Sequence, residues 1–175
     1  GLDLAVRIFE DVDLEVVMYE DSRSKSEMQH NTLIKDTMRQ NETTKEISLL
    51  LCSSSVFLRS NIESLGDSIK GSDGQERGNL VTNAELGFAS VSQVNNLATR
   101  CLRVMSSFIS WIDINIVVQD TLATIFQALQ DKHLRANALL CIYSLVKKGM
   151  DPMVKVKLLE SVDILSVLQG VDWFS

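Results

Sequence analysis

The sequence predicts an all-α fold, and three observations support this prediction. Apolar residues recur mostly at spacings of three and four, which places them on one face of a helix. Aromatic residues make up only 6% of the chain and there is a single proline, unlike sequences rich in β-strands and turns. Two helix-start signals, Asp113 and Asp151, lie about 40 residues apart, the usual length of a HEAT repeat of two antiparallel helices. We therefore expect an α-solenoid of HEAT-like helix pairs, with residues 1–175 forming a fragment of a larger solenoid.

The first part of the chain predicts three helical stretches, each with apolar residues at helical spacing: 2–12, 28–38 and 45–69. A polar stretch separates the first two. Residues 71–78 contain several glycines and no apolar side chain, so we expect a flexible loop between helices there.

Capping residues define the helices of the second part. An apolar face between about residues 90 and 112 leads into Trp111, which we expect to pack one helix against its neighbour. Asp113 is placed to cap the next helix, and Gly149 to stop the one after that. Asp151 is placed to cap a last helix, from 152 to about 169, with Pro152 at its first position.

Composition limits the class of protein. The chain has 175 residues, 45% of them hydrophobic, and a net charge of −6. It contains no run of about 18 uncharged apolar residues, so we expect no membrane insertion. The three cysteines, Cys52, Cys101 and Cys141, are widely spaced without a CxxC pair, which favours a reducing compartment. Cys101 and Cys141 fall on predicted apolar helix faces, so we expect both to pack in the core.

The sequence offers little for catalysis. The only histidines, His30 and His133, lie far apart and neither has a second metal ligand three or four residues away. The sequence carries no GxSxG or HExxH motif. We expect no catalytic residue, no metal site and no cofactor, and predict that the protein is not an enzyme.

Positive charge gathers locally near the C-terminal end of this acidic chain. Between Lys132 and Lys157 basic residues outnumber the single acid, Asp151. The candidate RNA contacts in this run are Lys147, Lys148, Lys155 and Lys157. A solvated outer face is the alternative interpretation, because cations near a helix C-terminus are favoured by the helix dipole in any case.

Three blocks of the sequence resemble the exportin-T family of the importin-β superfamily. They are Asn31 to Arg39, Ser110 to Asp113, and Lys148-Gly149-Met150-Asp151-Pro152 with the residues that follow to Ser161. Residues 40–91 differ from the family pattern. Within the blocks, the residues with an evident structural role are Trp111, Asp113, Gly149, Asp151 and Pro152.

The resemblance implies an importin-β/exportin-type solenoid that acts as a nuclear export receptor. Such a receptor binds tRNA cooperatively with GTP-bound Ran, contacts nucleoporins, and shuttles between nucleus and cytoplasm. The alternative is a HEAT-repeat protein–protein adaptor, or a karyopherin with a different cargo. The resemblance assigns no binding residue by motif.

Overall fold

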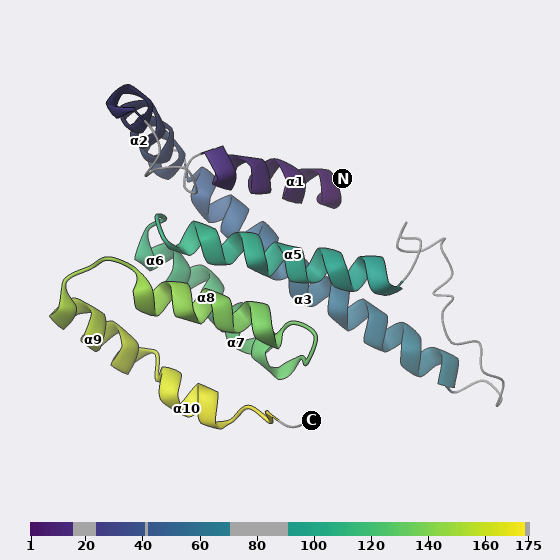
Figure 1. Ribbon diagram of the computed structural model, residues 1–175. Helices are drawn as coiled ribbons and strands as arrows, with labels where there is room; N and C mark the ends of the chain where they lie inside the picture. Colours follow the sequence, from purple (N-terminus) through teal and green to yellow (C-terminus); the bar gives the residue numbers. More distant parts are fainter. Residues whose placement is uncertain (16–23, 41, 71–90, 174–175) are drawn as a thin grey trace.

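The computed structural model describes residues 1–15, 24–40, 42–70 and 91–173, with side chains omitted for 63–70. Within these ranges all regular secondary structure is helical (Figure 1), so the prediction of an all-α fold is confirmed. The loop predicted at residues 71–78 lies outside the described residues.

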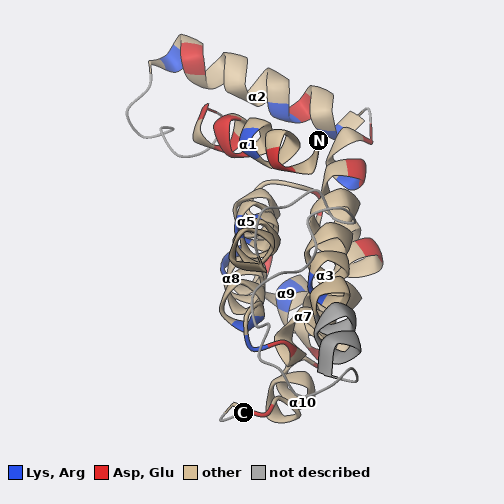
Figure 2. Ribbon diagram, turned by 90° about the vertical axis from the view of Figure 1, so that its right-hand side faces the viewer, with Lys and Arg blue, Asp and Glu red and all other residues tan. Residues whose placement is uncertain are grey.

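Three helices form one layer of the molecule. Helices α1 (Leu2–Asp13), α5 (Val91–Ile109) and α8 (Arg135–Lys147) lie side by side and run in the same direction (Figure 1). Helices α3 (Thr43–Lys70) and α7 (Leu122–Gln130) form a second layer and run the opposite way. Each long helix of the first layer therefore packs on an antiparallel partner of the second, as Figure 2 shows for α5 with α3 and α8 with α7.

The remaining helices lie around these two layers. Helix α2 (Lys25–Gln40) packs on α3. A short helix α6 (Ile114–Ile116) continues through a π-helical turn, η3 (Val117–Thr121), directly into α7. Helices α9 (Pro152–Ser161) and α10 (Ile164–Gln169) follow α8.

Helix α5 supplies the centre of the core. Its buried side chains contact α1 and α8 within its own layer and α3 in the other. Those on its apolar face are Val94, Leu97, Ala98, Cys101, Leu102, Val104, Met105, Phe108 and Ile109. Burial of such side chains stabilises the fold by about 1.5–3 kcal/mol for each large one. The apolar face predicted between residues 90 and 112 is thus confirmed as core.

The predicted helix caps are present. The Asp113 carboxylate accepts a hydrogen bond of 2.8 Å from the Asn115 backbone N–H. The Asp151 carboxylate accepts bonds from the N–H groups of Met153 and Val154 at 2.9 and 3.1 Å. Pro152 occupies the first turn of α9, where the absent N–H removes no helical hydrogen bond.

Two features differ from the sequence prediction. Helix α8 ends at Lys147 because Lys148 turns to an extended conformation with ψ 132°, and Gly149 follows without left-handed geometry. The helix predicted from 152 to 169 is broken between α9 and α10, where Asp163 adopts left-handed backbone angles (φ 46°). The apolar spacing continues through this break, so apolar periodicity alone did not reveal it.

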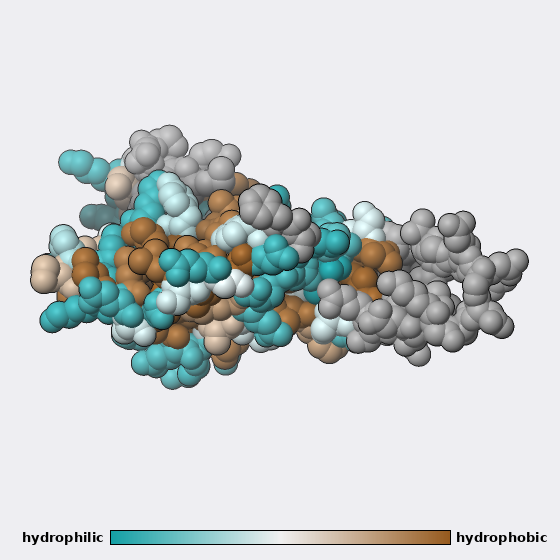
Figure 3. All heavy atoms as spheres, turned by 90° about the horizontal axis from the view of Figure 1, so that it is seen from below, coloured by the Kyte–Doolittle hydropathy of each residue, from teal (hydrophilic) through white to brown (hydrophobic). Residues whose placement is uncertain are grey.

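An apolar groove lies between α8 and the α9–α10 pair, and Asp163 at the break is among its lining residues. Its volume is about 580 Å³, and its lining includes Val146, Val156, Leu159 and Leu165. Figure 3 views the molecule from below and shows apolar side chains gathered on this face.

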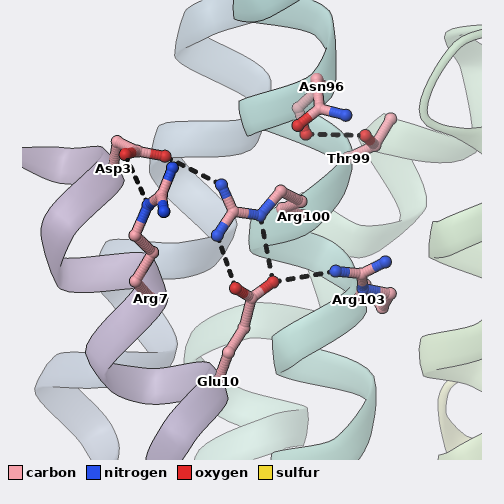
Figure 4. Close-up of polar contacts among 7 residues, drawn as sticks. All are labelled: Asp3, Arg7, Glu10, Asn96, Thr99, Arg100 and Arg103. Carbon is pink, nitrogen blue, oxygen red and sulfur yellow. Dashed lines mark hydrogen bonds and ion pairs between the residues drawn. The ribbon is translucent and has the colours of Figure 1, made fainter.

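A network of ion pairs joins α1 to α5 (Figure 4). The Arg100 guanidinium donates to both Glu10 carboxylate oxygens, at 3.0 and 2.5 Å, and to Asp3 at 2.8 Å. Arg103 donates to Glu10 at 2.9 Å. The hydrogen bond from Arg100 is the main reason that the Glu10 pKa is lowered, and Arg103 adds to the effect against the opposing effect of burial. The network therefore fixes α1 against the central helix.

We predict that Glu10→Gln lowers the free energy of unfolding by about 1–2 kcal/mol at pH 7, because bonds to a charged acceptor are lost. The folded-state pKa of Glu10 lies below its unfolded value, so its contribution is present above pH ~4.3 and is lost as pH falls. Urea unfolding of the unmodified protein and of the Glu10→Gln variant should therefore show that their difference in free energy of unfolding becomes smaller from pH 7 to pH 3.5. Asp11→Asn, an exposed change on the same helix, is the control. An equal loss in that control would contradict the assignment.

Candidate functional site

The C-terminal ends of α1, α5 and α8 lie along one edge of their layer (Figure 1, left side). Each helix end carries carbonyl groups without helical partners and a partial negative charge. The arrangement follows from three parallel helices that begin at the same side of the molecule. This edge therefore favours cations beside it.

Two cations satisfy the carbonyls at the end of α5. The Lys148 ammonium donates to the carbonyl oxygens of Ile109 and Ser110, at 2.9 and 3.1 Å. The Arg39 guanidinium, from α2, donates to the carbonyl oxygen of Trp111 at 3.1 Å. Arg39 therefore attaches α2 to the C-terminal end of α5, and Lys148 attaches the α8–α9 connection to the same end.

Trp111 anchors this end of α5. Its side chain is 7% exposed, and its ring centroid lies 5.1 Å from that of Phe108. The Arg39 guanidinium carbon lies 5.8 Å from the centroid of the Trp111 ring, a cation–π geometry. The packing role predicted for Trp111 agrees with these contacts.

A polar pocket opens at the same edge. Its volume is about 390 Å³. It is lined by Asp13 from α1, by the end of α5, and by the end of α8 with the connection after it. The residues from α5 and α8 are Ser106, Ser107, Ser110, Tyr143, Ser144, Lys147, Lys148 and Gly149.

The acidic member of the pocket is a buried carboxyl. Burial raises the pKa of Asp13, against smaller lowering effects of a hydrogen bond with Ser107 and the charge of Lys35. Its Oδ1 atom has no hydrogen-bond partner among the described residues and is shielded from solvent. Asp13 therefore forms part of the wall, while the serine, tyrosine and lysine side chains supply the groups that a ligand reaches.

The four predicted RNA contacts divide between two places. Lys147 and Lys148 both line the pocket. Lys147 is exposed, with its ammonium 5.6 Å from the centroid of the Tyr143 ring. Burial, and secondarily the charge of Arg39, lowers the pKa of Lys148, whose hydrogen bonds are made to α5. Lys148 is thus a structural cap, and Lys147 is the lysine available to a ligand of the pocket.

Lys155 and Lys157 belong to α9 and do not line the pocket. Positions two apart on a helix point about 200° from each other, so these two lysines face different sides. Lys157 is exposed and Lys155 is half-buried. The predicted set therefore does not form one continuous basic surface.

Another basic residue of the run is also used in packing. The Arg135 guanidinium donates to the carbonyl oxygen of Leu129, at the end of α7, at 3.0 Å. It also lies 6.0 Å from the ring centroid of Trp173. The sequence run does not distinguish such capping residues from free cations, because their partners are carbonyl groups that the fold brings near.

Within the described ranges, no group of three or more His, Cys, Asp and Glu side chains is placed to hold a metal ion. Burial raises the pKa of Cys52 and Cys101 to about 12 and that of Cys141 well above its usual value. No helix in the described ranges is long and apolar enough to cross a membrane. Within the described ranges the chain is a helical scaffold.

Comparisons with known proteins identify the scaffold's family. A family model described as "Exportin 1-like protein" matches residues 1–142. The chain is 30% identical to human exportin-T over 176 residues, which cover 100% of the chain and 15% of that protein. The zebrafish (Danio rerio) exportin-T gives the same identity and coverage. Dictyostelium discoideum exportin-T is 27% identical over 169 residues, or 96% of the chain and 12% of that protein.

The chain belongs to the exportin 1-like family. The resemblance to exportin-T, which the sequence blocks indicated, is confirmed over the whole chain. Members of this family are transport receptors, so the prediction that the chain is not an enzyme is also confirmed. The chain spans about 15% of the length of the human and zebrafish relatives.

We predict that Trp111→Ala lowers the free energy of unfolding by about 3–5 kcal/mol, because a buried indole is replaced by a cavity. Chemical denaturation followed by circular dichroism measures the change. Trp111→Phe keeps an aromatic ring beside Phe108 and should cost less. Unchanged stability of the alanine variant would mean that this side chain is not part of the core.

We expect Lys148→Met to lower the free energy of unfolding by about 1–2 kcal/mol, because two carbonyl groups at the end of α5 lose a charged donor. Lys147→Met is the matched control, since it removes the neighbouring charge from an exposed side chain. Thermal unfolding of the two variants compares them. Equal effects would contradict a capping role specific to Lys148.

Proposed function

We propose that this chain is part of a nuclear export receptor that binds tRNA cooperatively with GTP-bound Ran and shuttles between nucleus and cytoplasm through contacts with nucleoporins. The observation that supports the proposal most directly is the match of the whole chain to exportin-T from several organisms. The helical fold of the described ranges and the match of residues 1–142 to the exportin 1-like family also support it.

Contact with RNA on this chain would be local, because the net charge of −6 repels a polyanion overall. The cations suited to it are the exposed Lys147 and Lys157 and the half-buried Lys155. Lys148 is excluded from this set because its ammonium is bonded to α5. Such contacts bind phosphates with little regard to sequence, which suits a receptor for many tRNAs.

The proposal requires that tRNA and Ran-GTP increase each other's affinity. Cooperativity of this kind is a coupling free energy, so the increase must be the same in both directions. Fluorescence anisotropy of labelled tRNA, with and without Ran-GTP, measures one direction on the full-length receptor that contains this chain. The same titration with labelled Ran-GTP measures the other. Absence of tRNA binding under both conditions would favour a protein adaptor or a receptor for a different cargo.

We predict that replacing Lys147, Lys155 and Lys157 together by Ala weakens tRNA binding and flattens its dependence on salt. Each lost phosphate contact should reduce the slope of log K against log[salt] by roughly 0.7–0.9, because fewer counterions are released. The assay is repeated between 50 and 200 mM salt, in the range over which such effects are large. Unchanged affinity and slope would show that these lysines form a solvated surface.

A further inference from the structure

We propose that the pocket between the ends of α1, α5 and α8 binds one unpaired nucleotide of an RNA, with the base on Tyr143, the phosphate at Lys147 and the ribose against the serine hydroxyls. This inference rests on the proposed function, because it takes RNA to be the partner. It goes beyond phosphate attraction by assigning a place to the base and the sugar.

Tyr143 provides an aromatic surface at the pocket. Its side chain is 59% exposed, although neighbouring positions of α8, such as Ile142, are buried in the core. The Lys147 ammonium lies 5.6 Å from its ring centroid, so an aromatic ring and a cation are presented together. Stacking on exposed aromatic rings beside cations is the usual way in which proteins hold unpaired bases.

The serine hydroxyls suit a sugar. Ser110 is exposed, and its hydroxyl donates to the Ser107 carbonyl oxygen at 2.7 Å, which leaves lone pairs of the hydroxyl oxygen for a ligand donor. Ser144 is half-buried on the α8 side of the same pocket. A ribose 2′-hydroxyl both donates and accepts, so it can pair with either group.

The charges favour a nucleotide over an acidic peptide. The pocket wall contains the Asp13 carboxyl, and the ends of α1 and α8 add partial negative charge, whereas Lys148 already compensates the end of α5. A nucleotide can place its neutral ribose inside the pocket and its negatively charged phosphate beside the Lys147 ammonium. This placement keeps the phosphate away from the negative charge of the pocket wall. The volume of about 390 Å³ lies at the small end of ligand pockets and fits one nucleotide.

The test is the binding of a fluorescein-labelled hexauridylate and its 2′-deoxy counterpart to the full chain. We expect tighter binding of the ribose form. Tyr143→Ala should weaken it by roughly 5- to 150-fold, the range for loss of one base stack, whereas Tyr143→Phe should retain most of the affinity. Ser110→Ala combined with Ser144→Ala should reduce the preference for ribose over deoxyribose.

Matched controls separate the pocket from general effects. Leu140→Ala removes an exposed apolar side chain from the same helix, outside the pocket, and should leave binding unchanged. Lys147→Ala should weaken binding more than Lys157→Ala, although each removes one exposed charge. Melting temperatures of all variants confirm that they are folded.

Three outcomes would overturn the proposal: no effect of Tyr143→Ala, equal effects of Tyr143→Ala and Leu140→Ala, or displacement of the oligonucleotide from the pocket by a hexaglutamate peptide. Binding of tRNA with Ran-GTP is measured on the same variants. If tRNA binding persists while Tyr143→Ala has no effect on either ligand, the pocket assignment fails and the export function stands. If no tRNA binds to the unmodified full-length receptor, the export function fails, and the hexauridylate results still test the pocket.

Discussion

The packing of α5 against three neighbouring helices is the constraint on which the rest of the structure depends. Its apolar face contacts α1, α3 and α8, so any shift of α5 would expose core side chains in both layers. The end of α5 is equally constrained, since Trp111 is buried there and the last carbonyl groups receive Lys148 and Arg39. The pocket is a consequence of this arrangement. It lies where three parallel helices stop at the same level, and its walls are set by the register of those helices.

The lysine and arginine residues of this acidic protein have several different roles, and the sequence alone does not distinguish between them. Arg100 joins α1 to α5 through carboxylates. Lys148 and Arg135 satisfy carbonyl groups at helix ends. Lys147 lies one residue from Lys148 but is exposed beside an aromatic ring. The difference arises at the end of α8, where the chain turns to an extended conformation and carries the Lys148 side chain inward. Charge count alone therefore overstates the surface that is free to meet a polyanion.

The sequence predicted those parts of the structure that depend on neighbouring residues. Asp113 and Asp151 cap helices through groups two or three residues away, and the face of α5 follows from its apolar spacing. Contacts that depend on the tertiary fold were not predictable. Arg39 meets Trp111, and Arg100 meets Glu10, across 72 and 90 residues, and no local pattern marks either pair. The break at Asp163 was missed because apolar spacing continues through it. Tyr143 was not singled out because its exposed position beside the pocket depends on how α8 packs.

The burial of all three cysteines has a practical chemical consequence. Thiols react with maleimides and mild oxidants as thiolates, and burial raises the pKa of Cys52 and Cys101 to about 12, which disfavours the thiolate at neutral pH. Cys141 is shielded still further, and its Sγ donates to the carbonyl oxygen of Leu102 at 3.3 Å. A single cysteine introduced on an exposed helix position would therefore be modified selectively in the folded protein. Fluorophores or spin labels can therefore be attached beside the pocket without first removing the native thiols. If the native cysteines react slowly over time, that reaction reports opening of the core.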